Sequence, residues 1–321
     1  MNYDIIGDIH GHAEALTALL ASMDYRQSGG AWRHPARQAI FVGDFIDRGP
    51  KQIETVDIVR HMVDAGSAQA IMGNHEFNAI AWFLPDPDQP GEYLRPHHSA
   101  KHGDKNFQQH KAFLQEVVDT PRHKEIIEWF LTLPLWLELD EIRVVHACWH
   151  SRYMDYLAPR LAEGNRLTTE LMVDASREPA DETEKDTATP SVFKAVEALT
   201  KGIEVPLPES RFFIDTDRHK RHRVRTCWWD LDATSYRQAA LLEDEERKTL
   251  PDGQIPEHVR LGHDGGKPLF IGHYWRTGKP GLLSSKVACV DYSIANGGKL
   301  VAYRWEGEQV LYQHRFHWVG V

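Results

Sequence analysis

The chain has 321 residues, of which 41% are hydrophobic and 26% are charged, and its formal net charge is −10. This composition is typical of a soluble protein, and no apolar stretch is long enough to cross a bilayer, so we expect no membrane association. The negative charge argues against general nucleic-acid binding, because proteins that bind the phosphate backbone present basic surfaces. It also repels phosphorylated substrates unless bound cations reverse the local field.

The length predicts a single elaborated α/β catalytic domain over residues 1–321. Two stretches break its regular pattern, and we interpret them as insertions at about 85–125 and 155–265.

The cysteines and the first residues indicate the compartment. Cys148, Cys227 and Cys289 are scattered, odd in number and without a Cys-x-x-Cys pair, which indicates reduced thiols. The opening MNYDIIGD has no basic region before its apolar residues and does not resemble a secretory signal. We therefore expect a cytoplasmic protein.

The first 80 residues alternate between strand-like and helix-like patterns. The segments are a strand at 3–11, a helix at 12–23, a strand at 38–49, a helix at 53–66 and a strand at 67–76. Such β-α-β-α-β alternation implies crossover connections and a largely parallel sheet.

The rest of the chain is less regular. We predict, in order, a helix near 107–119, a helix leading into a strand at 123–139, a strand at 142–150, an exposed polar loop at about 155–190, a helix at 191–202, a strand at 267–275 and short antiparallel strands over 287–319. Six histidines fall in polar stretches and are predicted to lie in solvated loops. They are His97, His98, His102, His110, His219 and His222.

Five predicted strands each end in a group able to bind a metal. These groups are Asp8 with His10, Asp44, Asn74 with His75, His146, and His273. In open α/β sheets, ligands collect at the carboxyl ends of the strands, so the five ends can converge. Taken singly, each group has a simpler interpretation as a helix cap, a turn residue or a hydrogen-bonded core histidine. Their joint order, and the long motifs GDFIDRG and GNHE, favour one metal centre.

The motifs resemble those of a known superfamily. GDIHG at 7–11, GDFIDRG at 43–49, GNHE at 73–76, His146-Ala147 and Gly272-His273 are similar to the pattern of the calcineurin-like metallophosphoesterases. The likeness is strongest to the phosphoprotein phosphatase branch, and within it to bacterial and phage Ser/Thr phosphatases and diadenosine tetraphosphatase-related proteins. It implies a four-layered α/β/β/α sandwich of two mixed sheets flanked by helices.

The resemblance also implies a dinuclear metal centre. Asp8 and His10 would bind one ion, Asp44 would bridge both, and Asn74, His146 and His273 would bind the second. Oxygen and imidazole ligands without thiolate suit divalent manganese, with iron or zinc as alternatives. A bridging carboxylate holds two ions about 3.5 to 4 Å apart, where they share a hydroxide that attacks phosphorus in line.

Roles for the neighbouring residues follow from the same resemblance. His75 would protonate the leaving oxygen, and Asp47 would orient its imidazole. Arg48 would bind phosphate oxygens through its planar fork, together with Asn74. A second phosphate-binding arginine is expected between the last two histidines. Arg225 is our candidate, with Arg152 and Arg237 as alternatives.

The substrate stays open at this stage. We expect hydrolysis of phosphomonoesters, either on Ser/Thr phosphoproteins or on a small phosphorylated molecule. The alternatives are hydrolysis of diadenosine tetraphosphate and a catalytically silent binding scaffold, which predicts a damaged ligand set. Trp228-Trp229 is expected to pack rather than to stack on a base, and His150 either faces the site or is a hydrogen-bonded neighbour.

Overall fold

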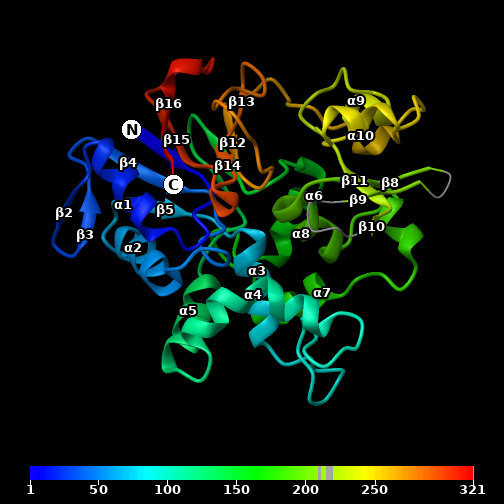
Figure 1. The fold of residues 1–321 in the computed structure, drawn as a ribbon, viewed down its shortest axis with the longest axis horizontal. Helices are drawn as coiled ribbons and strands as arrows, with labels where there is room; N and C mark the ends of the chain where they lie inside the picture. Colours follow the sequence, from blue (N-terminus) through cyan, green and yellow to red (C-terminus); the bar gives the residue numbers. More distant parts are fainter. Residues whose placement is uncertain (209–210, 215–219, 321) are drawn as a thin grey trace.

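The computed structural model describes residues 1–208, 211–214 and 220–320. Two mixed β-sheets pack against each other, and helices cover their outer faces (Figure 1). The four-layered α/β/β/α arrangement expected from the motifs is confirmed. His219 lies outside the described residues.

The first sheet carries the N-terminal part of the chain. Its strands, in spatial order, are β14 (Asp291–Tyr292), β15 (Lys299–Trp305), β1 (Asn2–Ile6), β4 (Arg37–Phe41) and β5 (Ala68–Ala70), with β16 (Phe316–Gly320) also paired to β15. As predicted, β1, β4 and β5 are parallel, and β15 runs antiparallel to β1. Their carboxyl ends therefore share one edge.

The second sheet repeats this arrangement. Its order is β13 (Val287–Cys289), β12 (Leu269–Ile271), β7 (Arg143–Val145) and β6 (Trp136–Glu138). The strands β7, β12 and β13 are parallel, and β6 is antiparallel to β7. Within 287–319 the antiparallel prediction holds for β14, β15 and β16, whereas β13 belongs to this second sheet.

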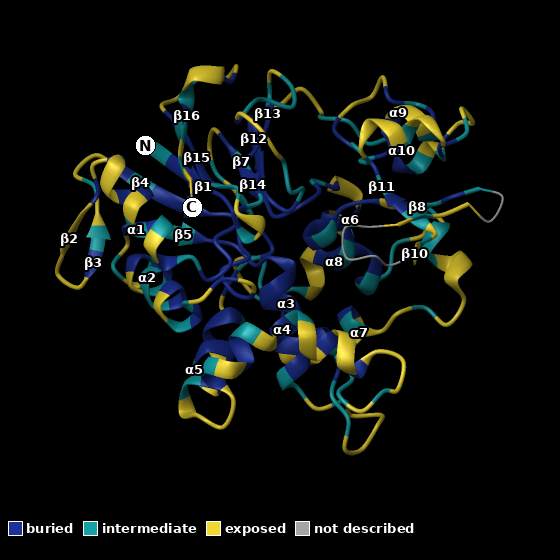
Figure 2. Cartoon of the chain, in the orientation of Figure 1, coloured by how far each residue is buried: buried dark blue, intermediate teal, exposed yellow. Residues whose placement is uncertain are grey.

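The core between the sheets follows from the two-residue period of a strand. In β4, Ile40 contributes to the cluster between the sheets, whereas Ala39 and Phe41 belong to the cluster that includes the helices. From the second sheet, Val144 and Phe270 join the cluster between the sheets. Figure 2 shows the strands mostly in dark blue, because both faces of the sheets are covered.

The helices use apolar stripes and local caps. They are α1 (Ala13–Ser22), α2 (Gln52–Asp64), α3 (Asn74–Phe83), α4 (Gly103–Val117), α5 (Pro121–Phe130), α6 (Ser151–Leu157), α7 (Thr169–Ser176), α8 (Val192–Lys201), α9 (Tyr236–Ala239) and α10 (Asp244–Lys248). In α1, Leu16, Leu19 and Leu20 are buried at helical spacing. Ser191 caps α8 by accepting the Lys194 N–H, and Gly202 ends it at a φ of 81°.

Three minor sheets complete the described chain. They pair β2 (Arg26–Ser28) with β3 (Ala31–Arg33), β8 (Glu204–Pro206) with β11 (Arg223–Arg225), and β9 (Phe213–Ile214) with β10 (Lys220–Arg221). Within the described part of the chain, no helix combines the length and apolar character that a membrane crossing requires.

The prediction of an exposed loop at about 155–190 was wrong for the first half of this segment. Helix α7 forms there and buries Leu171 and Met172, and the side chain of Thr168 caps it by accepting the Leu171 N–H at 3.1 Å. The polar neighbours concealed this short apolar stripe. The following 177–187 segment is largely exposed and includes a short 3-10 helix at Glu182–Asp186.

Phe270→Ala should strongly destabilise the sandwich, because it opens a cavity between the sheets. We expect the free energy of unfolding to fall by about 3 to 5 kcal/mol, measured by urea denaturation. Phe107→Ala is the control, since Phe107 is 41% exposed on α4. Removing its ring should lower the free energy of unfolding far less. Equal losses in the two variants would contradict this description of the core.

Candidate metal centre

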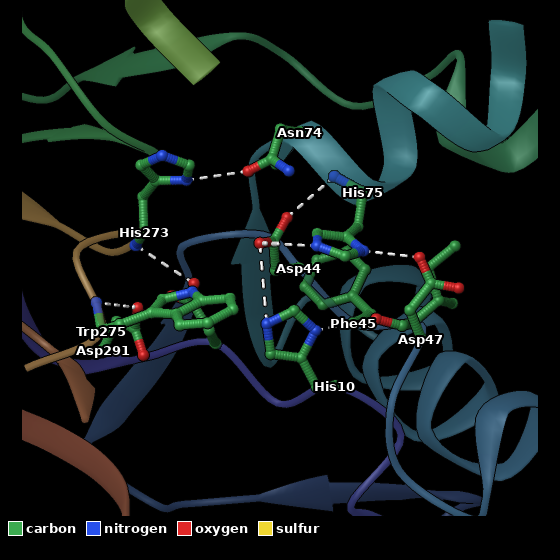
Figure 3. Close-up of polar contacts among 12 residues, drawn as sticks. His10, Asp44, Phe45, Asp47, Asn74, His75, His273, Trp275 and Asp291 are labelled. Atoms are coloured by element: carbon green, nitrogen blue, oxygen red, sulfur yellow. Dashed lines mark hydrogen bonds and ion pairs between the residues drawn. The ribbon is translucent and has the colours of Figure 1, made fainter. Parts of the chain in front are cut away.

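The predicted ligands meet at the carboxyl edge of the two sheets. His10 follows β1, Asp44 follows β4, Asn74 begins α3 after β5, His146 follows β7, and His273 follows β12. Figure 3 shows His10, Asp44, Asn74 and His273 converging from these different segments. Residues that are far apart in the sequence are therefore brought together, as their positions at the ends of predicted strands led us to expect.

The carboxylate of Asp44 lies at the middle of the cluster. Its Oδ2 is 3.8 Å from His10 Nε2, 3.9 Å from His75 Nε2 and 3.4 Å from His146 Nε2. Its Oδ1 accepts the backbone N–H of His75 at 3.0 Å. All four residues are buried, so this carboxylate is shared by imidazoles from separate elements.

Backbone carbonyls fix the orientation of two imidazoles. His10 Nδ1 donates to the carbonyl of Ile46 at 2.9 Å, and His146 Nδ1 donates to that of Val42 at 2.7 Å. A ring whose Nδ1 carries the proton can present the lone pair of Nε2 to a cation. Both Nε2 atoms face Asp44, so both rings are oriented as metal ligands require.

Asn74, His273 and Asp8 extend the cluster. Asn74 Oδ1 is 2.8 Å from His273 Nδ1 and 3.2 Å from His146 Nε2. The backbone N–H of His273 donates to Asp8 Oδ2 at 3.1 Å. The six residues expected to bind metal thus form one contiguous group.

The donor atoms fit divalent cations. Among the described residues, Asp8 Oδ1, His10 Nε2 and His273 Nε2 are buried without a hydrogen-bond partner, although buried polar groups are normally paired. Burial, with the nearby Asp291 carboxylate, raises the pKa of Asp8 well above its usual value. A cation would satisfy these atoms and compensate the packed negative charge.

The backbone around the centre is strained. Among the described residues, ten non-glycine residues have a positive φ, and six of them belong to this region. The six are His10, Asp44, Asp47, Arg48, His273 and Trp275. Such conformations are costly and cluster at functional sites, where the surrounding structure holds them in place.

Glu76 holds the strained turn that carries Asp44. Its carboxylate accepts the backbone N–H groups of Asp44 at 2.7 Å, Phe45 at 2.8 Å and Gly73 at 3.0 Å. Burial, together with Asp44, raises the pKa of Glu76 to about 7. Gly73 allows the close approach, because a Cβ there would lie 2.2 Å from Asp44 Oδ1.

A second histidine contacts the predicted His75–Asp47 pair. Asp47 Oδ2 lies 2.5 Å from His75 Nδ1 and 2.7 Å from His110 Nδ1, and all three side chains are buried. Asp44 and Asp47 outweigh burial and raise the pKa of His75. The prediction that His110 lies in a solvated loop was wrong. Its place in the buried stripe of α4, with Asn106, Phe113, Leu114 and Val117, was the signal that sequence reasoning missed.

Arg48 lies at the exposed side of the centre. Its guanidinium sits 5.3 Å from the ring of Trp275, and the backbone N–H of Trp275 donates to Asp291 Oδ2 at 2.7 Å. Asp291 is a second missed residue, a buried carboxylate at the end of an apolar strand. The aspartate thereby fixes the turn whose indole supports Arg48.

Of the three arginines considered as the second phosphate ligand, Arg225 is the one whose charge acts on a predicted ligand. After burial, its charge is the largest factor that lowers the pKa of His273, and its Nε is 3.5 Å from Glu204 Oε1. Arg237 instead donates to the carbonyl of Leu250. Arg152 lines a separate cavity of about 290 Å³.

Contacts decide the question left open for His150 and bear out the expected packing of Trp228 and Trp229. His150 caps α6, accepts the Tyr153 N–H at 3.4 Å and stacks on the Tyr153 ring. Trp228 and Trp229 are buried, and Trp228 Nε1 donates to the Tyr274 hydroxyl at 2.8 Å. His150 is therefore a hydrogen-bonded neighbour, and the two tryptophans pack.

Comparison with known proteins agrees with this geometry. The family model of the calcineurin-like phosphoesterases matches residues 1–181. An asymmetrical bis(5'-nucleosyl)-tetraphosphatase of Oceanobacillus iheyensis is 34% identical over 149 residues, which cover 46% of this chain and about half, 55%, of that protein. A symmetrical bis(5'-nucleosyl)-tetraphosphatase of Vibrio cholerae is 25% identical over 316 residues, 97% of each chain.

A solved structure of a protein serine/threonine phosphatase from Saccharomyces cerevisiae is also similar, at 12% identity and a TM-score of 0.46, covering 100% of this chain and 79% of that one.

The chain belongs to the calcineurin-like phosphoesterase family. It is a metallophosphoesterase, a hydrolase that acts on phosphoester bonds, and its described residues include His and Asp clusters able to hold metal.

Glu76→Gln should destabilise the metal-free protein, because an amide presents only one acceptor oxygen to three buried backbone N–H groups. We expect a loss of about 1 to 3 kcal/mol in the free energy of unfolding, measured by chemical denaturation. Glu128→Gln is the control, since Glu128 is a solvent-exposed residue of α5. If Glu76→Gln unfolds like the wild type, its carboxylate does not hold the Asp44 turn.

Proposed function

We propose that this site binds two divalent cations and hydrolyses phosphomonoesters. Asp8, His10 and Asp44 would hold one cation, and Asp44, Asn74, His146 and His273 the other. The observation that carries the proposal is the Asp44 carboxylate, whose Oδ2 is within 3.9 Å of three imidazole Nε2 atoms. The thiolate-free donor set suits manganese first, with iron or zinc as alternatives.

The residues around the cations have separate roles in binding the substrate and in protonating the leaving group. When bound, the cations would activate water and neutralise charge on the phosphoryl oxygens. Arg48 and Asn74 bind phosphate oxygens, and the Trp275 ring supports the Arg48 guanidinium. His75 donates a proton from Nε2 to the leaving oxygen, while Asp47 holds Nδ1 on its other side.

The preferred substrate is a phosphomonoester on a protein Ser/Thr or on a small molecule. The inserted segments at about 85–125 and 155–265 of the single catalytic domain would form the walls of the substrate cleft, with Arg225 as the second phosphate ligand. The complete ligand set opposes a silent scaffold. The three free thiols support a reducing compartment such as the cytoplasm.

A second candidate substrate is a dinucleoside tetraphosphate. The names of the relatives from Oceanobacillus iheyensis and Vibrio cholerae favour it, and the Vibrio alignment covers 97% of this chain. Water attack on phosphorus serves a phosphoester and a phosphoanhydride equally.

Asp44→Asn and His75→Asn should separate metal binding from proton donation. Asp44→Asn should lose metal and activity together, because it removes the shared anionic ligand. His75→Asn should keep the metal and lose about 10²- to 10⁴-fold in kcat, the usual contribution of a general acid. Metal content and p-nitrophenyl phosphate turnover are measured on the same manganese-loaded preparation. A metal-free His75→Asn protein would refute its role as the acid.

His110→Asn should weaken proton donation without removing metal, because Asp47 would lose one of its two imidazole partners. We expect a rate loss of about tenfold on p-nitrophenyl phosphate and a smaller loss on 2,4-dinitrophenyl phosphate, whose leaving group needs less protonation. His98→Asn, in the same inserted segment, is the control, since His98 is exposed and bonded to Glu92. Equal losses on both substrates would show that His110 does not act through His75.

A further inference from the structure

Arg95 is a cation held by neutral groups beside the proposed proton donor. It lies in the inserted segment between α3 and α4, where its Nη1 donates to Asn78 Oδ1 at 3.2 Å and its Nη2 donates to Gln109 Oε1 at 2.5 Å. Its Nε is buried without a partner, and within the described ranges no carboxylate forms an ion pair with it. Each terminal nitrogen keeps a second N–H for another acceptor.

Three other arginines of the chain differ from Arg95. Arg60 and Arg122 bind Glu125, and Arg177 binds Asp86 and Asp88. Leaving a half-buried guanidinium without a carboxylate is costly, because water is removed and no anion replaces it. Burial accordingly lowers the pKa of Arg95 to about 10. Arg95 is therefore a cation without an anionic partner in a chain of net charge −10, and an anionic ligand would supply that partner.

The anchors of Arg95 place it on the His75 side of the centre. Asn78 is one turn beyond His75 on α3, so the two residues share a helix face. Gln109 precedes His110, which contacts Asp47. The same guanidinium is thus fixed by both helices that flank the His75–Asp47–His110 group.

The charges around Arg95 extend across the site. Asp47 and Glu197 both oppose the lowering of the Arg95 pKa by burial. Arg225 in turn acts on Glu197 and, on the other side, on His273. Glu197 is therefore influenced by Arg225 and itself acts on Arg95.

We propose that Arg95 binds the leaving phosphate of a phosphoanhydride substrate and thereby sets how well this site cleaves nucleoside polyphosphates relative to monoesters. The inference rests on the proposed function. A water oxygen forms a bond to one phosphorus, and the bond between that phosphorus and the bridging oxygen breaks. The bridging oxygen leaves with the electron pair and takes the proton of His75, while the attacking water gives up a proton.

The leaving group explains why a cation belongs at this position. An alcohol released from a phosphomonoester is neutral after protonation and gains little from a guanidinium. A phosphate released from an anhydride keeps negative charge, and a planar arginine fork suits its oxygens. Stabilisation of charge that develops on the leaving group lowers the barrier for the anhydride selectively.

The test compares two substrate classes in matched variants of the manganese-loaded protein. Arg95→Gln should lower kcat/KM for diadenosine tetraphosphate and for inorganic tripolyphosphate by about 10- to 100-fold, while p-nitrophenyl phosphate changes by less than about twofold. Arg95→Lys keeps the charge but loses the planar fork, so its kcat/KM for the two anhydrides should lie between those of the wild type and Arg95→Gln. Arg122→Gln is the control, and both classes should change by less than about twofold. Thermal unfolding verifies that each variant folds.

The outcomes separate this inference from the proposed function. If Arg95→Gln loses activity equally on both substrate classes, or on neither, Arg95 does not bind a leaving phosphate. A wild type that cleaves the aryl ester but neither anhydride would refute the inference and leave the proposed function standing. A wild type that binds metal and cleaves none of the three would refute both. Loss on diadenosine tetraphosphate alone would point to nucleoside contacts and overturn the assignment to phosphate.

Discussion

The shared carboxylate of Asp44 is the constraint on which the rest of the site depends. Three imidazoles from different segments face its Oδ2 at 3.4 to 3.9 Å, and each arrives from the end of a different strand or helix. Although burial opposes it, the imidazoles of His146 and His75 hold the pKa of Asp44 well below its usual value, so the carboxylate is an anion that can bind a cation. The two sheets bring the groups together, and the glycines of the motifs give them room.

The strain at this edge is balanced by contacts outside it. Asp44, His10 and His273 adopt positive φ, which costs free energy for residues with a side chain. Glu76 compensates by accepting three backbone N–H groups around Asp44, and the apolar cluster between the sheets fixes the strands on which the turns rest. A rigid sandwich therefore supports an edge that would not hold its geometry alone.

The first 80 residues allowed the parallel strands and the shared edge that gathers Asp8, His10, Asp44 and Asn74 to be predicted, because the carboxyl ends of parallel strands meet at one edge. His110 and Arg95 were not predictable in the same way. Their roles depend on how α4 packs against the Asp47 loop and α3, a tertiary contact across more than 60 residues for the His110–Asp47 pair. His110 has polar neighbours in the sequence, which indicated a solvated loop, whereas its place in the buried stripe of α4 decided the outcome.

The most direct test of the central claim is the anomalous scattering of crystals soaked in manganese. The account predicts two peaks about 3.5 to 4 Å apart on either side of Asp44, one beside Asp8 and His10 and the other beside Asn74, His146 and His273. A single peak that is not shared by Asp44, or a peak among Asp47, His75 and His110, would contradict it.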